Sequence, residues 1–219
     1  MCYNIINMKK HFWKIEYSYT LIVIFTVILF MIPTSFSSKE AGHISHWNEV
    51  YNKLDYLFTA MSAQAESDIV KGLKNAQTLE QREFYMMQLV KAYLELTELN
   101  KSQKKRYSQQ YMNGNKVNKK DIYHFDNIYV HKSGAIVGIK DINNKDELSP
   151  GFMMFVDLNG VKSPNIWGRD IFGIDIYSDG KIKPMGHEKQ VTELKKDCSV
   201  HGLGVSCSHY YRIGGEFVE

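Results

Sequence analysis

The first hydrophobic feature of the chain is an almost unbroken apolar block at residues 15–32, which follows three lysines and is closed by Pro33. A helix rises about 1.5 Å per residue and a bilayer core takes about 20 helical residues, so residues 15–36 suffice for one membrane span. The same block fits the apolar part of a cleaved secretion signal with a small-residue exit at residues 35–38. The pattern therefore predicts a membrane anchor and leaves the cleaved signal open.

After Pro33 the apolar positions recur at steps of three and four, which predicts an amphipathic helix. Its apolar face consists of Ile44, Trp47, Tyr51, Leu54, Leu57, Phe58 and Met61. A second helix is predicted at residues 79–99, and its apolar stripe consists of Phe84, Met87, Val90, Leu94 and Thr97.

Residues 100–120 carry seven Lys or Arg and no acid, which predicts a solvated and flexible basic linker. Tyr107 and Tyr111 lie among these charges, and this is also the composition of a weak nucleic-acid patch. No base-reading motif accompanies them, and the net charge of +3 adds no further case for nucleic acid.

From residue 121 onward, β-branched and aromatic runs alternate with turn signals, which is typical of strands. Turns are predicted at Ser133-Gly134, Asn159-Gly160 and Asp179-Gly180, and the residues after His209 are expected to return as an edge strand. We expect an antiparallel sheet of four or five strands, covered on one face by the long N-terminal helix. The predicted class is α+β.

These patterns divide the chain into five predicted parts. They are a basic leader (1–11), a transmembrane helix (12–33), an amphipathic extension of that helix (34–65), a helical insertion with the basic linker (66–120), and a strand-rich globular head (121–219). The aromatic content of 13% and the presence of only 4 prolines agree with a folded head.

The three cysteines lie on both sides of the apolar block. If the leading lysines keep the N-terminus cytoplasmic, Cys2 stays in a reducing compartment, whereas Cys198 and Cys207 reach an oxidising one. Together with His201 and His209 the distal pair also offers four zinc donors, but their spacing is not a standard one. A disulfide between Cys198 and Cys207 is therefore the favoured interpretation.

The chain has no sequence motif of an enzyme. The G-x-S-x-G elbow, the H-E-x-x-H helix and the phosphate-binding loop are absent. His124, His131 and His187 have no carboxylate at an informative spacing. We therefore expect no catalytic site.

The N-terminal segment resembles the prepilin-type signal of type IV pilins and type II secretion pseudopilins. That signal joins a basic leader to Phe, places Glu at the fifth position counted from this Phe, and continues as a long apolar helix with Pro near its end. Here Phe12, Glu16 and Pro33 stand at those positions. The resemblance implies cleavage by prepilin peptidase between His11 and Phe12, methylation of the new N-terminus, and a role of Glu16 in subunit assembly.

A second segment resembles the globular part of pseudopilin-like proteins, with the pattern V-D-x-N-G-x-x-x-P-N-x-x-G-x-D-x-F. The matching positions are Val156, Asp157, Asn159, Gly160, Pro164, Asn165, Gly168, Asp170 and Phe172. The two-cysteine tail is similar to theirs as well, and it implies a short C-terminal strand.

The same segment carries hard oxygen donors of the type that calcium prefers, and some pseudopilins hold Ca²⁺ in such a loop. The candidate ligands are Asp157, Asn159, Asn165 and Asp170. Asn-Gly turns and Asx side chains that cap loop amides explain the same residues. Both interpretations stay open at this point.

Taken together, the resemblance implies a subunit of a type IV pilus or of a type II secretion filament. Its expected location is the inner membrane, crossed once, with the N-terminus cytoplasmic and the head periplasmic or extracellular. Its expected partners are the membrane, homologous pilin-like subunits and prepilin peptidase. Because His11 stands where the peptidase prefers a small residue, two alternatives remain: a non-assembling single-pass membrane protein with an exported binding domain, and a signal-cleaved secreted protein.

Overall fold

The computed structural model describes residues 42–63, 76, 78–144 and 148–217. The apolar block, the predicted processing site at His11 and Phe12, and Glu16 lie outside the described residues. Within the ranges described, no helix combines the length and the hydropathy needed to cross a bilayer. The chain divides into residues 1–42 and residues 43–219, and only the second unit is described below.

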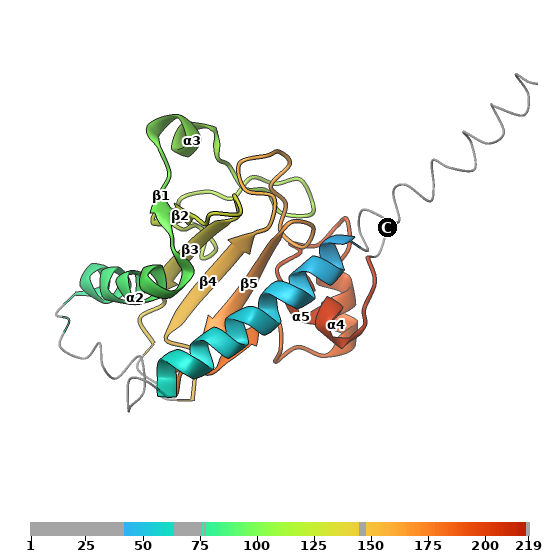
Figure 1. Cartoon of the computed structure of the whole chain (residues 1–219). Helices are drawn as coiled ribbons and strands as arrows, with labels where there is room; N and C mark the ends of the chain where they lie inside the picture. The colour runs from blue at the N-terminus through green and yellow to red at the C-terminus, as the bar shows by residue number, and fades with distance from the viewer. Residues whose placement is uncertain (1–41, 64–75, 77, 145–147, 218–219) are drawn as a thin grey trace, which may run out of the picture. The chain divides into compact units, whose positions relative to one another are not determined.

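The described chain contains one antiparallel sheet in which every strand pairs with its neighbour in sequence, in the order β1 to β6 (Figure 1). The α+β class is therefore confirmed. The strands are β1 (Thr97–Glu98), β2 (Ile128–Val130), β3 (Ile136–Asp141), β4 (Phe152–Asp157), β5 (Ile171–Ile176) and β6 (Ile182–Pro184). The sheet has six strands instead of the four or five expected, and β1 comes from the segment predicted as insertion and linker.

Two of the predicted turns connect neighbouring strands. Gly134 lies between β2 and β3 and Gly180 between β5 and β6, with φ angles of 92° and 79° that favour glycine. The Asn159-Gly160 turn is also present, but β4 and β5 are joined by residues 158–170 and not by a two-residue hairpin loop. Asp157 caps the turn through the amides of Asn159 and Gly160, and ten further residues follow before β5 begins at Ile171.

One face of the sheet is covered by helices. Residues 42–63 are helical, and the buried side of this N-terminal helix follows the predicted apolar face. Trp47 stacks on Phe172 of β5, with ring centroids 4.8 Å apart and planes inclined by 14°. Helix α2 (Leu79–Leu94) contributes Met86, Met87 and Val90 to the same core.

The prediction that the second helix extends to residue 99 is wrong. Glu95 adopts a left-handed conformation with a φ of 51°, which ends α2 and turns the chain into β1. The predicted apolar stripe is also displaced, because Phe84 is 54% exposed whereas Met86 and Met87 are buried.

The opposite face of the sheet is covered as well, which the sequence did not indicate. Helix α3 (Lys101–Arg106) begins with a capping box formed by Asn100 and Gln103, and the chain then folds over the sheet. Tyr111, Phe125, Trp167 and Val205 share a second core with side chains of β3, β4 and β5. Residues 100–120 are therefore not a flexible linker, because apolar side chains between the lysines anchor the segment.

The expected C-terminal edge strand is absent from the described residues. After α4 (Val191–Asp197), the chain forms α5 (Cys207–Tyr210) and a 3₁₀ turn, η2 (Tyr211–Ile213). The adjacent side chains of Tyr210 and Tyr211 are both buried in the helix-side core, whereas a strand would direct neighbours to opposite faces.

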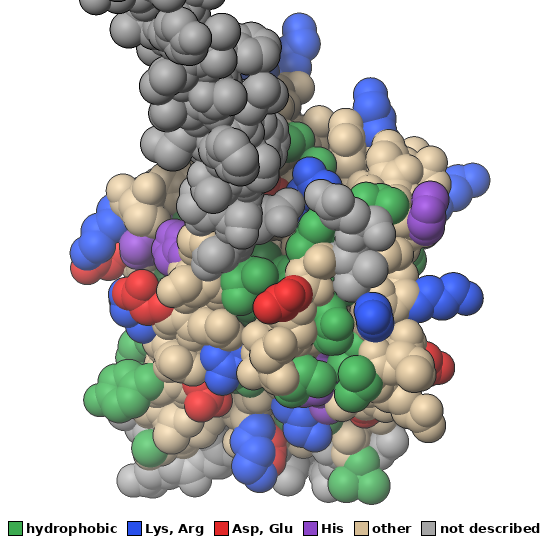
Figure 2. Space-filling model, turned by 90° about the vertical axis from the view of Figure 1, so that its right-hand side faces the viewer, with side chains coloured by type: hydrophobic (Ala, Val, Ile, Leu, Met, Phe, Trp, Pro, Cys, Tyr) green, Lys and Arg blue, Asp and Glu red, His purple; other side chains and the backbone are tan. Residues whose placement is uncertain are grey.

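The surface beside these elements has mixed character. On the face turned toward the viewer in Figure 2, charged side chains of both signs and histidines surround separate hydrophobic areas. Scattered apolar groups of this kind are normal for a solvent-exposed surface.

Candidate functional sites

The acidic turn predicted from the sequence is built around Asp157, the last residue of β4. Its side chain is fully buried. One carboxylate oxygen accepts hydrogen bonds from the amides of Asn159 and Gly160, at 3.2 and 2.9 Å. The other accepts a hydrogen bond from the hydroxyl of Tyr107, at 3.0 Å. The carboxylate therefore closes the turn and anchors the segment that covers the sheet.

Asp170 lies beside this turn at the entrance to β5. Its Oδ1 accepts a hydrogen bond from the amide of Ile166, and its Oδ2 accepts one from Nδ2 of Asn159, at 2.7 Å. The Tyr107 hydroxyl in turn accepts a hydrogen bond from Nε2 of Gln109, at 3.0 Å. The result is a connected polar network that joins the end of β4 to the covering segment of residues 100–120.

Two buried carboxyl groups in one network oppose each other's ionisation. Burial first, and then the negative charge of Asp170, raise the pKa of Asp157 to about 8. Burial also raises the pKa of Asp170 to about 6. Desolvation, followed by the charge of Asp157, holds the pKa of the Tyr107 phenol well above its usual value. Burial therefore favours the protonated form of both carboxyl groups.

The four candidate calcium ligands all take part in hydrogen bonds within the protein. Every carboxylate oxygen of Asp157 and Asp170 already accepts a hydrogen bond from the protein. Asn165, the fourth candidate, donates to the carbonyl of Ser108 at 3.2 Å. The amide oxygens of Asn159 and Asn165 are buried without partners, and amide oxygens are among the ligands that calcium accepts. Among the described residues no group of three or more Asp, Glu, His or Cys is arranged for a metal. Turn capping accounts for the hydrogen bonds of Asp157, and calcium binding stays a prediction.

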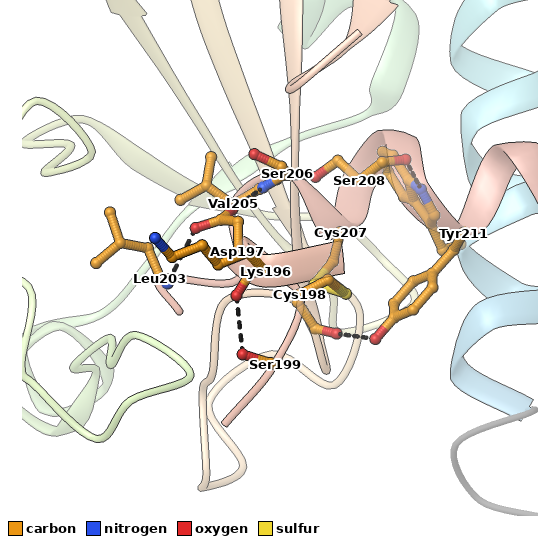
Figure 3. The surroundings of a disulfide bond; sticks show 12 residues. Lys196, Asp197, Cys198, Ser199, Leu203, Val205, Ser206, Cys207, Ser208 and Tyr211 are labelled. Atoms are coloured by element: carbon orange, nitrogen blue, oxygen red, sulfur yellow. Dashed lines mark hydrogen bonds between the residues drawn. A yellow bond between two sulfur atoms is a disulfide. The ribbon is translucent and has the colours of Figure 1, made fainter. Parts of the chain in front are cut away.

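The C-terminal cysteines form the disulfide that the sequence favours (Figure 3). Cys198 follows α4 and Cys207 begins α5, and both are fully buried with an S–S distance of 2.06 Å. The bond engages both sulfur atoms, which removes the zinc alternative with His201 and His209. The carboxylate of Asp197, the residue before Cys198, accepts hydrogen bonds from two loop amides, at 3.0 and 2.7 Å.

The disulfide loop is fastened to the sheet and to the N-terminal helix. The Ser208 carbonyl, one residue after Cys207, accepts a hydrogen bond from the indole of Trp47 at 2.8 Å. The Ser208 hydroxyl accepts one from the amide of Gly173 in β5, also at 2.8 Å, and the Tyr211 hydroxyl donates to the Gly168 carbonyl at 3.0 Å. Figure 3 shows Ser208 and Tyr211 on the side of the loop that faces this helix.

Sequence reasoning missed a second titratable cluster at the β5–β6 hairpin. The Tyr177 hydroxyl lies 2.8 Å from Nε2 of His187, and the Asp175 carboxylate lies 3.7 Å from Nδ1 of the same ring. Burial raises the pKa of Asp175 to about 7 and lowers the pKa of His187. Asp175 and Tyr177 are two residues apart in an extended segment, which places them on one side. That spacing was the available signal, but the return of His187 depends on the hairpin.

No protein-family model, curated protein or solved structure matches the chain. Its role must be inferred from its own residues. The features that bear on that role are an amphipathic helix packed on an antiparallel sheet, a capped acidic turn at the end of β4, and a C-terminal loop closed by a disulfide.

Proposed function

We propose that the protein is a pilin-like, membrane-anchored filament subunit with a structural and assembly role. The observation that supports this most is the N-terminal helix of residues 42–63, whose apolar side packs on an antiparallel sheet through Trp47 and Phe58. In the sequence this helix follows an apolar block that contains Glu16 and is closed by Pro33, two of the prepilin-type elements. A helix laid on such a sheet is the arrangement that the resemblance implies for the head.

The proposed assembly follows from the solvent preference of the apolar block. In the membrane, residues 15–32 are surrounded by acyl chains, and in a filament they are surrounded by the same segment of other subunits. Glu16 neutralises the free amine of Phe12 on a neighbouring subunit after processing. An unpaired carboxylate in that environment costs several kcal/mol, so the pair selects one register of neighbouring helices.

The described helix leaves the bundling role to the apolar block. Its outer side is exposed and carries polar or charged groups, among them His46, Glu49 and Asn52. Lys53 and Glu49 form an ion pair of 2.6 Å there. Residues 42–63 are therefore suited to solvent on one side and to the sheet on the other.

The first test is the N-terminus of the protein purified from its native membrane. A mature chain that starts at Phe12 is expected. A start at Met1 or Met8 removes the amine partner of Glu16 and refutes the assembly mechanism, leaving a non-assembling anchored protein. A start near Ser38 identifies a signal-cleaved secreted protein.

The second test separates assembly from anchoring. Glu16→Gln keeps the side-chain volume but loses the charge, so we expect normal membrane insertion and loss of sedimentable filaments. Glu49→Gln removes one charge from an exposed position and serves as the matched control, with filaments retained. Equal filament yields from both variants contradict the role of Glu16.

A further inference from the structure

A groove of about 350 Å³ opens beside α3, on the side of the sheet covered by residues 100–120. Three lysines line it: Lys104 from the last turn of α3, and Lys116 and Lys119 from the segment that follows. Tyr107 and Phe125 belong to the same lining. The groove therefore combines ammonium groups with aromatic side chains.

The three lysines are exposed to solvent. None of the ion pairs among the described residues involves them. The acid that lines the groove, Asp126, lies 3.2 Å from Nε2 of His124. Three like charges around one small groove repel each other, and a bound anion relieves that repulsion.

The walls of the groove are held in place before any ligand arrives. The Tyr107 hydroxyl is bound to the buried carboxylate of Asp157. Lys140 donates to the carbonyls of Ile122 and His124, at 3.1 and 3.2 Å, which holds the backbone at His124, another lining residue. A site formed in advance loses little entropy when a ligand binds.

We propose that this groove binds a small polyvalent anion whose phosphate or carboxylate groups meet the lysines. An ammonium group is a point charge, and no arginine lines the groove to favour one planar, bidentate partner. Phosphate and carboxylate are therefore both accepted. The volume lies near the lower end of the range for small-molecule sites, roughly 300–1,000 Å³.

A nucleic-acid strand fits this groove less well than a small anion. Tyr107 is stacked on Phe155, with planes inclined by 10°, and Phe125 is buried, so neither ring presents a free face to a base. Because the lysines are exposed, we expect weak, salt-sensitive binding, since ionic screening acts over about 10 Å at 0.1 M salt.

Isothermal titration of the full chain in detergent tests the proposal, with pyrophosphate and citrate as probes and oligothymidylate as the competing class. The groove variant is Lys116→Gln with Lys119→Gln. The matched control is Lys195→Gln with Lys196→Gln, which removes the same charge from exposed positions of α4. Near-UV circular dichroism verifies that both variants keep the native fold.

We expect both small anions to bind and the groove variant to weaken binding at least about tenfold, against less than about twofold for the control, because it removes two of the three facing charges. Three results overturn the proposal: neither small anion binds, both variants lose affinity equally, or oligothymidylate binds more tightly than either small anion. The proposal does not depend on N-terminal processing, so its failure is distinct from that of the filament function.

Discussion

Breaking the disulfide between Cys198 and Cys207 is expected to loosen the whole C-terminal end of the head. The bond joins residues nine apart, and the loop-entropy relation ΔS ≈ −2.1 − 1.5R ln n then gives about −8.7 cal/mol/K. At 25 °C this corresponds to about 2.6 kcal/mol of the free energy of unfolding. For a domain of this size the melting temperature is expected to fall by about 5–10 °C.

The structure also locates where the loss becomes visible. Ser208, next to Cys207, accepts the hydrogen bond of the Trp47 indole, and Trp47 stacks on Phe172. When the loop is no longer closed, the end of α5 is less constrained and Trp47 loses a fixed partner. Reduction is therefore expected to alter the fluorescence of Trp47 before the far-ultraviolet dichroism of the sheet changes.

Urea unfolding of the full chain in detergent, with and without a phosphine reductant, measures the effect. The variant with Cys198→Ala and Cys207→Ala is expected to have the stability of the reduced wild-type protein, with or without reductant. Cys2→Ser is the control and is expected to keep the full response. Equal stability of oxidised and reduced protein, or a response that disappears with Cys2→Ser, refutes the reasoning.

Three further predictions concern the sheet and its buried charges. Gly138→Ala is expected to lower the unfolding free energy by about 1–3 kcal/mol in a urea titration, since the added Cβ would lie 2.3 Å from a ring carbon of Phe155; an unchanged midpoint contradicts this. Arg82→Met removes the guanidinium that lies 3.2 Å from the buried Asp141 carboxylate. The unfolding free energy is expected to fall by about 3–5 kcal/mol at alkaline pH. The loss is expected to shrink on acidification, as Asp141 takes up a proton. The pKa of Asp157 is about 8 in the folded state and about 3.9 in the unfolded state. Between these values the folded chain keeps a proton that the unfolded chain releases. This group therefore lowers the stability as the pH rises through that window. Asp157→Asn is expected to flatten the pH dependence between about pH 5 and pH 8, and an unchanged slope in thermal melts would rule this out.

Local patterns in the sequence predicted much of the architecture because they depend on neighbouring residues alone. The apolar face of the N-terminal helix follows a spacing that any helix imposes, and Gly134 and Gly180 sit in turns that require a positive φ. The buried strands β3 to β5 and the pairing of Cys198 with Cys207 also followed from composition and spacing.

Other features were decided only when distant segments met. The sequence offered Asp157 as a turn cap or a metal ligand, but gave no sign of its hydrogen bond with the Tyr107 hydroxyl, fifty residues earlier. The partner of His187 became visible only through the hairpin that returns it to Asp175. A linear pattern contains no information on such pairs, since their contact depends on the closed sheet.

Residue spacing along the chain therefore determined the class, the helix that covers one face and the turns, since backbone geometry sets each of these within a few residues. Tertiary packing decided that the basic segment covers the second face, that the last residues are helical, and that the acidic turn is a capped, buried network. The physical reason is that burial and hydrogen bonding between distant segments, such as Trp47 and Ser208, outweigh local preference wherever that preference is weak.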